Sequence, residues 1–321
     1  MSTSFIQSVD ARTRLAGANR LEVLLFTLGK DQGTGREEVF GINVFKVREV
    51  MHVPEITHAP DMPPTVEGMV SLRGVMMPVI NLPRFCGVEP EQPCKILIVT
   101  EYNKHIQGFL VYSVDTIKRL VWEDVKAPPP MLAHRLGGLV TAVTKIDDDR
   151  LVMIMDVEKV LAETAEFYQD DHLFDAVQPL DIQDMTVLFA DDSSVARNQI
   201  ERTLERLGIR SIAANNGAEA WTKLQELAHR AAALGRPVSD LIQAVITDVE
   251  MPEMDGYVLT RRIKEDPRFE GVPVIMHSSL SAEANQAIGT GVGADAYVPK
   301  FEPIELAAAV HKLLEGHPRA A

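Results

Sequence analysis

The second half of the chain alternates between short apolar runs and segments long enough to form a helix. The runs MTVLFA, RSIAA, QAVITD, VPVIMH and DAYVP occupy residues 185–190, 210–214, 243–248, 272–277 and 295–299. Each run has the length of a buried strand, and a helix-length segment follows it. A βα unit repeated five times requires a parallel sheet with helices on both faces. The sequence therefore predicts a doubly wound, five-stranded α/β domain over residues 185–316, with ligands bound at the carboxyl edge of its sheet.

Polar side chains stand where these predicted strands end. Asp191 and Asp192 follow the first strand, Asp248 ends the third, Ser278 follows the fourth, and Lys300 follows the fifth. Because the carboxyl ends of parallel strands meet at one edge, we expect these side chains to converge. Clustered carboxylates repel one another, and a hard divalent cation relieves that repulsion. Mg²⁺ suits a site built from carboxylates, a carbonyl and waters.

An aspartate beside such a cation can act as a covalent nucleophile toward phosphorus. The cation and a lysine neutralise the charge that develops on the phosphoryl oxygens, and a hydroxyl donates to a third oxygen. Taken singly, Asp191 also suits a helix cap or first turn, Ser278 a strand-end hydroxyl, and Lys300 a solvated charge. Their joint occurrence along the five units favours a phospho-accepting site with Asp248 as the nucleophile.

The first half of the chain is rich in short strand-like runs separated by turn signals such as LGKDQGTG and KAPPP. This pattern is typical of small β-barrels or of a sandwich. A helix is expected near residues 157–165, and residues 43–51 suit a strand and a helix almost equally. No Ser-His-Asp order, glycine-rich phosphate loop or HExxH motif occurs in this half, so binding is the better interpretation. The strand-like runs cover residues 21–28, 37–42, 77–82, 95–100, 107–112, 138–146 and 150–156.

An acidic stretch separates the halves. Residues 163–184 hold seven acidic side chains and no Lys or Arg, which is typical of a linker. The expected organisation is an N-terminal arm (1–20), a β-rich domain (21–165), an acidic linker (166–184), the α/β domain (185–316) and a tail (317–321).

Composition excludes several classes of partner and site. The net charge of −14 argues against nucleic acid or an anionic membrane as the main partner, because phosphates are bound through Lys and Arg. No apolar run approaches the roughly 20 residues that span a bilayer, so a cytoplasmic protein is expected. The two cysteines, Cys86 and Cys94, lack CxxC spacing, so reduced thiols are expected instead of a zinc site or a disulfide framework.

Residues 184–316 resemble a response-regulator receiver domain of the CheY kind. The stretches VLFADDSSVAR, VITDVEMPEMDGY, VPVIMHSS and ADAYVPKF carry the resemblance. It implies that Asp248 accepts phosphate from a histidine kinase. It also implies that Asp192 binds Mg²⁺ directly, that Asp191 does so mainly through water, and that the backbone carbonyl of Glu250 completes the metal shell.

By the same resemblance, Ser278 is the switch hydroxyl and Tyr297 the aromatic residue that moves inward with it. The chain departs from the family after the fifth strand, where Lys-Pro, often with a cis peptide, is usual. Here Phe301 follows Lys300, and a cis bond would cost about 2.5 to 4 kcal/mol, so a trans bond and an altered loop are expected. The segment 217–244 is also longer than a minimal second helix and its loop. Both a partner surface and a longer helix fit it.

The first half resembles CheW-like coupling domains over about residues 8–165, through VEGMVSLRGVMMPVINL, LEVLLFTLG and VFGINVFKVREVM. The resemblance implies two small SH3-like barrels that dock onto chemoreceptor cytoplasmic tips and onto the chemotaxis histidine kinase. Arg73 matches the arginine of the family's NLRG signature, with Ser71 in place of the asparagine. Arg73 would present a planar donor to an acidic or carbonyl-rich partner, and a structural arginine that braces the barrel junction explains it equally well.

Together the halves resemble a CheV-type protein, in which phosphorylation of the receiver modulates the docking of a coupling domain. The resemblance implies a chemotaxis adaptor at membrane receptor arrays, not an enzyme. One alternative is that the receiver is a phosphate sink for the kinase and that the coupling half provides only its localisation. A less favoured alternative is an aspartyl phosphatase or phosphotransferase, which requires a DxD arrangement after the first strand, whereas Asp191 and Asp192 are adjacent and Asp248 ends the third strand.

Overall fold

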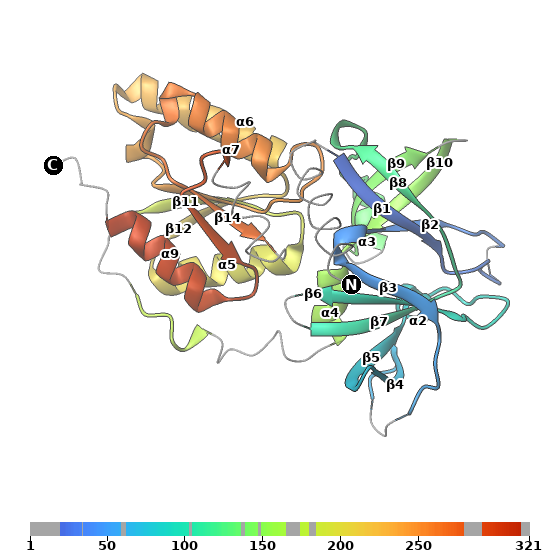
Figure 1. Ribbon diagram of the computed structural model, residues 1–321. Coiled ribbons are helices and arrows are strands. Elements are labelled where there is room, and N and C mark those ends of the chain that lie inside the picture. The colour runs from blue at the N-terminus through green and yellow to red at the C-terminus, as the bar shows by residue number, and fades with distance from the viewer. Residues whose placement is uncertain are drawn as a thin grey trace. The chain divides into compact units, whose positions relative to one another are not determined.

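The protein is described by a computed structural model in which two compact units divide the chain, one from Leu21 to Tyr168 and one from Gln169 onward (Figure 1). The residues that the structure describes are 20–33, 35–58, 62–102, 105–135, 139–146, 149–164, 174–179, 184–278 and 291–315.

The first unit contains two five-stranded sheets. The first sheet has the order β8-β1-β2-β10-β9, in which β1 and β2 are antiparallel and β2 and β10 are parallel. Backbone hydrogen bonds between Lys126 and Val143, 2.9 and 2.8 Å long, bring the chain after β8 beside β9 and so join the two edges of the sheet. Its strands are β1 (Arg20–Thr27), β2 (Val39–Asn43), β8 (Ser113–Val121), β9 (Val140–Ile146) and β10 (Arg150–Met155).

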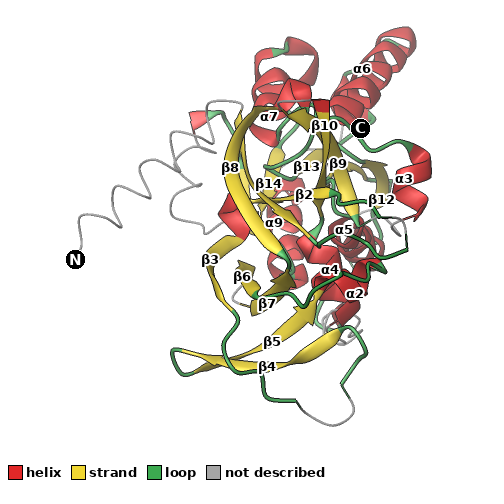
Figure 2. Ribbon diagram, turned by 90° about the vertical axis from the view of Figure 1, so that its right-hand side faces the viewer, coloured by secondary structure: helices red, strands yellow, loops and turns green. Residues whose placement is uncertain are grey.

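The second sheet of this unit has the order β3-β6-β7-β5-β4. Backbone hydrogen bonds between Thr57 and Met69, 2.9 and 2.8 Å long, bring the chain after β3 beside β4 and again join the edges. Figure 2 shows β4 and β5 as a hairpin at the lower end of the view. The strands are β3 (Val47–His52), β4 (Val66–Leu72), β5 (Val75–Asn81), β6 (Ile96–Tyr102) and β7 (His105–Val111).

Both faces of these sheets are buried in places. On β1, Leu25 points into the first barrel, whereas its neighbour Phe26 joins a cluster that includes Ile98 and Phe109 of the second sheet. On β6, Leu97 belongs to the interior of the second barrel and Ile98 to the shared cluster. Successive side chains of a strand point to opposite faces, so two barrels that pack together require near-continuous apolar runs. The predicted pair of small barrels is confirmed.

Short helices connect the strands. The ambiguous residues 43–51 form a 3-10 turn, η1 (Val44–Lys46), followed by β3, and the helix expected near residues 157–165 is α4 (Val157–Thr164). Two strands, β4 and β8, lie outside the strand-like runs of the sequence. In β8 most positions are exposed, and β4 carries Gly68 at a positive φ, so neither strand presents an apolar run. The remaining helices are α2 (Leu82–Cys86), η2 (Trp122–Asp124) and α3 (Pro130–Arg135).

The second unit contains a five-stranded sheet of order β12-β11-β13-β14-β15, in which all neighbours are parallel. The predicted doubly wound domain is therefore confirmed. Nearly every strand residue of β11, β13 and β14 is buried, as expected for strands covered on both faces. The strands are β11 (Thr186–Ala190), β12 (Arg210–Ala214), β13 (Ala244–Thr247), β14 (Val274–Ser278) and β15 (Ala296–Pro299).

Helices cover both faces of this sheet (Figure 1). Helices α5 (Ser194–Leu207) and α9 (Pro303–Glu315) share one apolar cluster with the sheet, and α6 (Gly217–Leu234) and α7 (Gly256–Glu265) share another. The helix expected between the fourth and fifth strands falls largely in residues 279–290, outside the described residues.

The long segment after β12 is an extended helix with an ordered return. Helix α6 has 18 residues and ends at Gly235, whose left-handed backbone caps it. The turn η6 (Val238–Asp240) follows, with Val238 buried. The side chain of Gln243 donates to the Ser239 carbonyl at 2.8 Å and accepts from the Thr186 amide at 2.7 Å, which fixes the return to β13.

Part of the acidic stretch packs onto the second unit. The Phe174 side chain is 2% exposed, and the Arg202 guanidinium of α5 lies 4.3 Å from its ring centroid. Val177 is 5% exposed and belongs to the same cluster as Met185 and Leu207. Residues 174–179 are therefore attached to the face of the sheet that α5 and α9 cover.

Within the described ranges, no helix is both long enough and apolar enough to cross a membrane.

Candidate functional site

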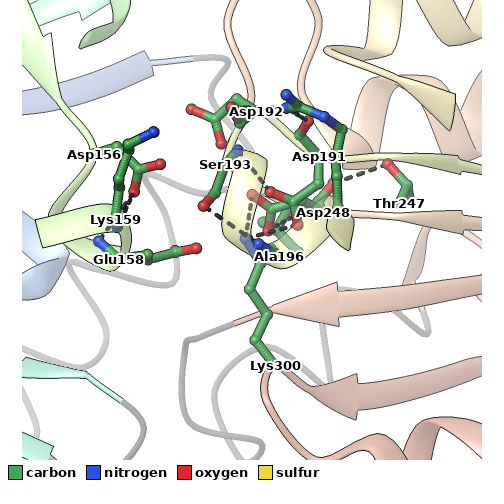
Figure 3. Close-up of polar contacts among 12 residues, drawn as sticks. Asp156, Glu158, Lys159, Asp191, Asp192, Ser193, Ala196, Thr247, Asp248 and Lys300 are labelled. Carbon is green, nitrogen blue, oxygen red and sulfur yellow. Dashed lines mark hydrogen bonds and ion pairs between the residues drawn. The ribbon is translucent and has the colours of Figure 1, made fainter. Parts of the chain in front are cut away.

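Three carboxylates converge at the carboxyl edge of the parallel sheet (Figure 3). Asp191, Asp192 and Asp248 each place a carboxylate oxygen within 4.8 Å of the others. The backbone extends the parallel ladder past the strand ends, since the Asp191 amide donates to the Ala214 carbonyl at 3.2 Å and the Asp248 amide to the Ala190 carbonyl at 2.8 Å. The expected convergence of the strand-end aspartates is thus present in the structure.

Lys300 completes this cluster from the end of β15. Its Nζ lies 2.8 Å from Asp191 Oδ2 and 3.1 Å from Asp248 Oδ2, and its side chain is 1% exposed. Buried charges are tolerated when they are paired, and here one ammonium pairs with two carboxylates. Three carboxylates and one ammonium leave a formal charge of −3 + 1 = −2 on these four side chains. Oxygen donors with an excess of two negative charges fit a hard divalent cation such as Mg²⁺.

The loop after β11 is organised around Asp191. Its Oδ1 accepts the Ser193 amide at 2.9 Å, and Arg197 of α5 donates to the Asp191 and Asp192 carbonyls at 2.8 and 3.0 Å. Ser193 is the N-cap of α5, with its side chain 3.5 Å from the Ala196 amide. The interpretation of Asp191 as the N-cap of the following helix is therefore wrong, because Ser193 caps α5. Its other oxygen, Oδ2, faces Lys300 instead.

Asp248 is held by its own backbone surroundings. Its Oδ1 accepts the Val249 amide at 2.7 Å, and its carbonyl accepts the Thr247 hydroxyl at 2.9 Å. A β-carbon added to Gly256 would lie 1.9 Å from the Asp248 carbonyl oxygen, so α7 can begin this close to Asp248 only with glycine. Asp255 before it caps α7 by accepting the Val258 amide at 2.7 Å.

The roles of three of these supporting residues were not predicted from the sequence: Arg197, Thr247 and Gly256. An Asp-Gly pair such as Asp255-Gly256 is a common turn signal, and it does not reveal the close approach of Gly256 to Asp248. A glycine placed one residue after a capping aspartate, within ten residues of a strand-end aspartate, is a usable signal for such an approach.

Ser278 ends β14 and is buried, and its carbonyl accepts the Lys300 amide at 3.0 Å. Tyr297 on β15 packs against a cluster formed by Val249, Tyr257 and Met276. Burial, followed by the electrostatic effects of Tyr297 and Glu250, raises the pKa of Tyr257 above its ordinary value. The Tyr257 phenol therefore stays protonated beside Tyr297.

Phe301 follows Lys300 through a trans peptide, and no bond in the described residues is cis. The expectation of a trans bond is confirmed. Phe301 has a φ of 63°, in the left-handed region, and the side chain is 8% exposed. The ion pairs of Lys300 are nevertheless close, so the departure from Lys-Pro has not displaced the lysine.

In the first unit, Arg73 occupies the turn between β4 and β5 with a φ of 52°. Its side chain is 72% exposed, and its guanidinium lies 2.9 Å from Glu49 Oε2 of β3. This ion pair ties a hairpin to a strand of the same barrel. Most of the guanidinium surface remains accessible to a partner.

The two cysteines are free thiols. Burial, followed by the charge of Glu38, raises the pKa of Cys86 to about 12. Burial and the charge of Glu67 raise the pKa of Cys94 to about 11. Both sulfurs are therefore protonated at neutral pH, in keeping with the absence of a metal motif in the sequence.

Comparison with known proteins agrees with the division into two units. Residues 22–165 match the CheW-like domain, and residues 187–311 match the response regulator receiver domain. Over 307 residues the chain is 31% identical to the chemotaxis protein CheV3 of Helicobacter pylori, an alignment that covers 92% of this chain and 96% of that protein. The chain belongs to the CheV family of chemotaxis proteins.

A second CheV protein of Helicobacter pylori, CheV2, is 27% identical over 97% of this chain and 98% of its own length. The chemotaxis protein CheW of Klebsiella aerogenes is 26% identical over 44% of this chain and 81% of its own length. As a CheV-family member, the protein is a chemotaxis adaptor that joins a CheW-like domain to a two-component receiver domain.

Proposed function

We propose that this CheV-family adaptor couples chemoreceptor cytoplasmic tips to the chemotaxis histidine kinase through its CheW-like domain, and that phosphorylation of Asp248 modulates the coupling. The observation that carries the proposal is the buried arrangement of Asp248, Asp191 and Lys300 in the same chain as a CheW-like domain. Burying a charge cluster of this kind costs stability, so its presence around a strand-end carboxylate indicates a functional site.

Phosphoryl transfer to Asp248 is the proposed reaction. A carboxylate oxygen of Asp248 attacks phosphorus, the bond between phosphorus and the kinase histidine nitrogen breaks, and the electron pair returns to the imidazole. Asp191, Asp192, Asp248 and the Glu250 carbonyl would hold Mg²⁺, which would neutralise charge on the phosphoryl oxygens. Lys300 Nζ, which lies 3.1 Å from Asp248 Oδ2, neutralises a further oxygen of the acyl phosphate.

The proposed response involves Ser278 and Tyr297. Ser278 lies at the end of β14, and its backbone carbonyl accepts a hydrogen bond from the Lys300 amide. Its hydroxyl donates to a phosphoryl oxygen, and Tyr297, which already packs against the cluster that includes Tyr257, moves further inward with it. Phosphorylation thereby favours one of two receiver conformations, and the coupling domain responds to that population shift.

Arg73 is the proposed partner-binding residue of the CheW-like domain. Exposed arginines offer a planar set of donors that fit carboxylates and carbonyls, and the Glu49 ion pair orients this one. The partners are the histidine kinase and the receptor tips, so the protein acts at the cytoplasmic face of receptor arrays and not on nucleic acid.

The experiment that tests this function is phosphotransfer from the cognate kinase to the full-length protein, in the presence of Mg²⁺. We expect label on the wild type and none on the Asp248→Ala variant. Equal labelling of the two proteins would contradict the proposal. A long-lived acyl phosphate supports a switch, whereas turnover faster than kinase labelling supports the phosphate sink. Hydrolysis of phosphomonoesters by the wild type would support the phosphatase alternative.

A further inference from the structure

The connection between β15 and α9 is short. β15 ends at Pro299 and α9 begins at Pro303, so residues 300–302 alone turn the chain from the sheet into the helix. Lys300, the first of them, has its ammonium in the charge cluster and its amide bound to the Ser278 carbonyl at 3.0 Å. The position of Lys300 therefore depends on how the next two residues leave the sheet.

Phe301 makes this turn with a left-handed backbone, at a φ of 63°. Glu302 precedes a proline and is restricted to extended conformations, so the reversal falls on Phe301. A residue with a β-carbon is strained in the left-handed region, where glycine and asparagine are common. Such strain persists only where the surrounding structure holds it.

The Phe301 side chain supplies a means of holding that conformation. It is 8% exposed although it lies in a connecting segment, and burial of a phenylalanine ring stabilises the backbone that carries it. Lys300 beside it is among the largest fully buried side chains of the described residues. A buried aromatic anchor thus stands immediately after the buried lysine that reaches Asp191 and Asp248.

We propose that Phe301 is the positioning residue for Lys300: its buried ring holds the left-handed turn that keeps the Lys300 ammonium on Asp191 and Asp248. The inference rests on the proposed function, in which Lys300 assists phosphoryl transfer to Asp248.

The test uses acetyl phosphate with Mg²⁺ and the full-length protein, so that kinase docking does not enter. In this reaction the phosphorus bond to the acetyl oxygen breaks, acetate leaves with the electron pair, and a bond from phosphorus to the Asp248 carboxylate forms. We expect Phe301→Ala, which loses the ring but keeps the strain, to slow phosphorylation by about tenfold. Phe301→Leu, which keeps an apolar side chain, is expected to retain most of the rate, and Phe301→Gly, which loses ring and strain together, to fall between them.

A second background separates positioning from general destabilisation. In Lys300→Met, where the ammonium is already gone, Phe301→Ala is expected to produce no further loss of rate. An equal loss in both backgrounds, or no loss in the wild-type background, would overturn the inference. If Phe301→Ala fails to fold, the comparison of Phe301→Leu with Phe301→Gly in both backgrounds decides in the same way.

Failure of the proposed function has a different signature in this experiment. It would appear as an unphosphorylated wild type, or as wild-type labelling in the Asp248→Ala control. A phosphorylated wild type with unaltered Phe301 variants overturns the positioning role alone.

Discussion

The charge cluster of the receiver and the exposed arginines of the CheW-like unit differ in how they are buried. In the receiver, the side chains of Asp191, Asp248 and Lys300 are at most 5% exposed and converge within hydrogen-bonding distance. In the CheW-like unit, the arginines of the ion pairs at Arg73 and Arg119 are 72% and 65% exposed. Exposed pairs contribute roughly 0 to 1 kcal/mol each, whereas removal of one partner from a buried pair costs about 3 to 5 kcal/mol.

This contrast matches the proposed division between phosphorylation at the receiver cluster and partner binding at the exposed arginines. A buried cluster fixes the geometry that a reaction needs, and its members cannot be exchanged one at a time. Scattered surface pairs leave donors accessible to partners and tolerate substitution. Substitutions in the receiver cluster are therefore expected to impair phosphorylation. Substitutions of the exposed arginines of the CheW-like unit are expected to impair binding but not folding.

The largest effect is expected at the nucleophile. Asp248→Asn removes the attacking carboxylate while preserving its shape, so phosphorylation by acetyl phosphate with Mg²⁺ should fall to the background of the assay. Asp184→Asn, which changes an exposed aspartate of the same unit, is the matched control and should label normally. Residual labelling of Asp248→Asn at the wild-type rate would place the acceptor elsewhere.

The next effect concerns the aromatic anchor of the acidic stretch. Phe174→Ala should lower the free energy of unfolding of the receiver by about 3 to 5 kcal/mol, because it empties a buried aromatic site. Arg202→Ala, which removes only the cation over the ring, should cost about 0.5 to 1 kcal/mol.

Urea unfolding followed by Trp221 fluorescence, in a Trp122→Phe background, measures both Phe174→Ala and Arg202→Ala. A Phe174→Ala value no larger than the Arg202→Ala value would mean that the segment is a free linker.

A smaller effect is expected at Gly256. Gly256→Ala forces a β-carbon toward the Asp248 carbonyl oxygen and should destabilise the receiver by about 1 to 3 kcal/mol, with slower phosphorylation. Gly291→Ala is the control, since nothing lies within 4 Å of the β-carbon it adds. Thermal unfolding and labelling rates together check the prediction. Equal behaviour of the two variants would show that the loop after Asp248 yields without consequence.

The smallest effect on stability is expected at Arg73. Arg73→Ala removes an exposed ion pair, so the free energy of unfolding of the CheW-like unit should change by less than about 1 kcal/mol. Binding to receptor–kinase assemblies should nevertheless weaken, and a pelleting assay with those assemblies measures it. A large loss of stability with unchanged binding would instead assign Arg73 a structural role.

The sequence predicts the receiver better than the CheW-like unit, for a physical reason. Strands β11, β13 and β14 are buried on both faces and stand out as apolar runs, and their topology alone brings the strand-end aspartates together. Strands β4 and β8 have exposed positions in their patterns, so no such run marks them. The roles of Gly256 and Phe174 depend on which segments approach in space, and local patterns do not carry that information.

The most direct test of the account measures receptor–kinase binding and kinase output of the full-length protein with and without beryllofluoride and Mg²⁺, which imitate a phosphoryl group on aspartate. We predict that the wild type changes its binding or its effect on kinase output when the reagent is added, and that Asp248→Ala does not. An unchanged wild type, or an equal change in Asp248→Ala, would contradict the claim that the receiver sets the state of the coupling domain.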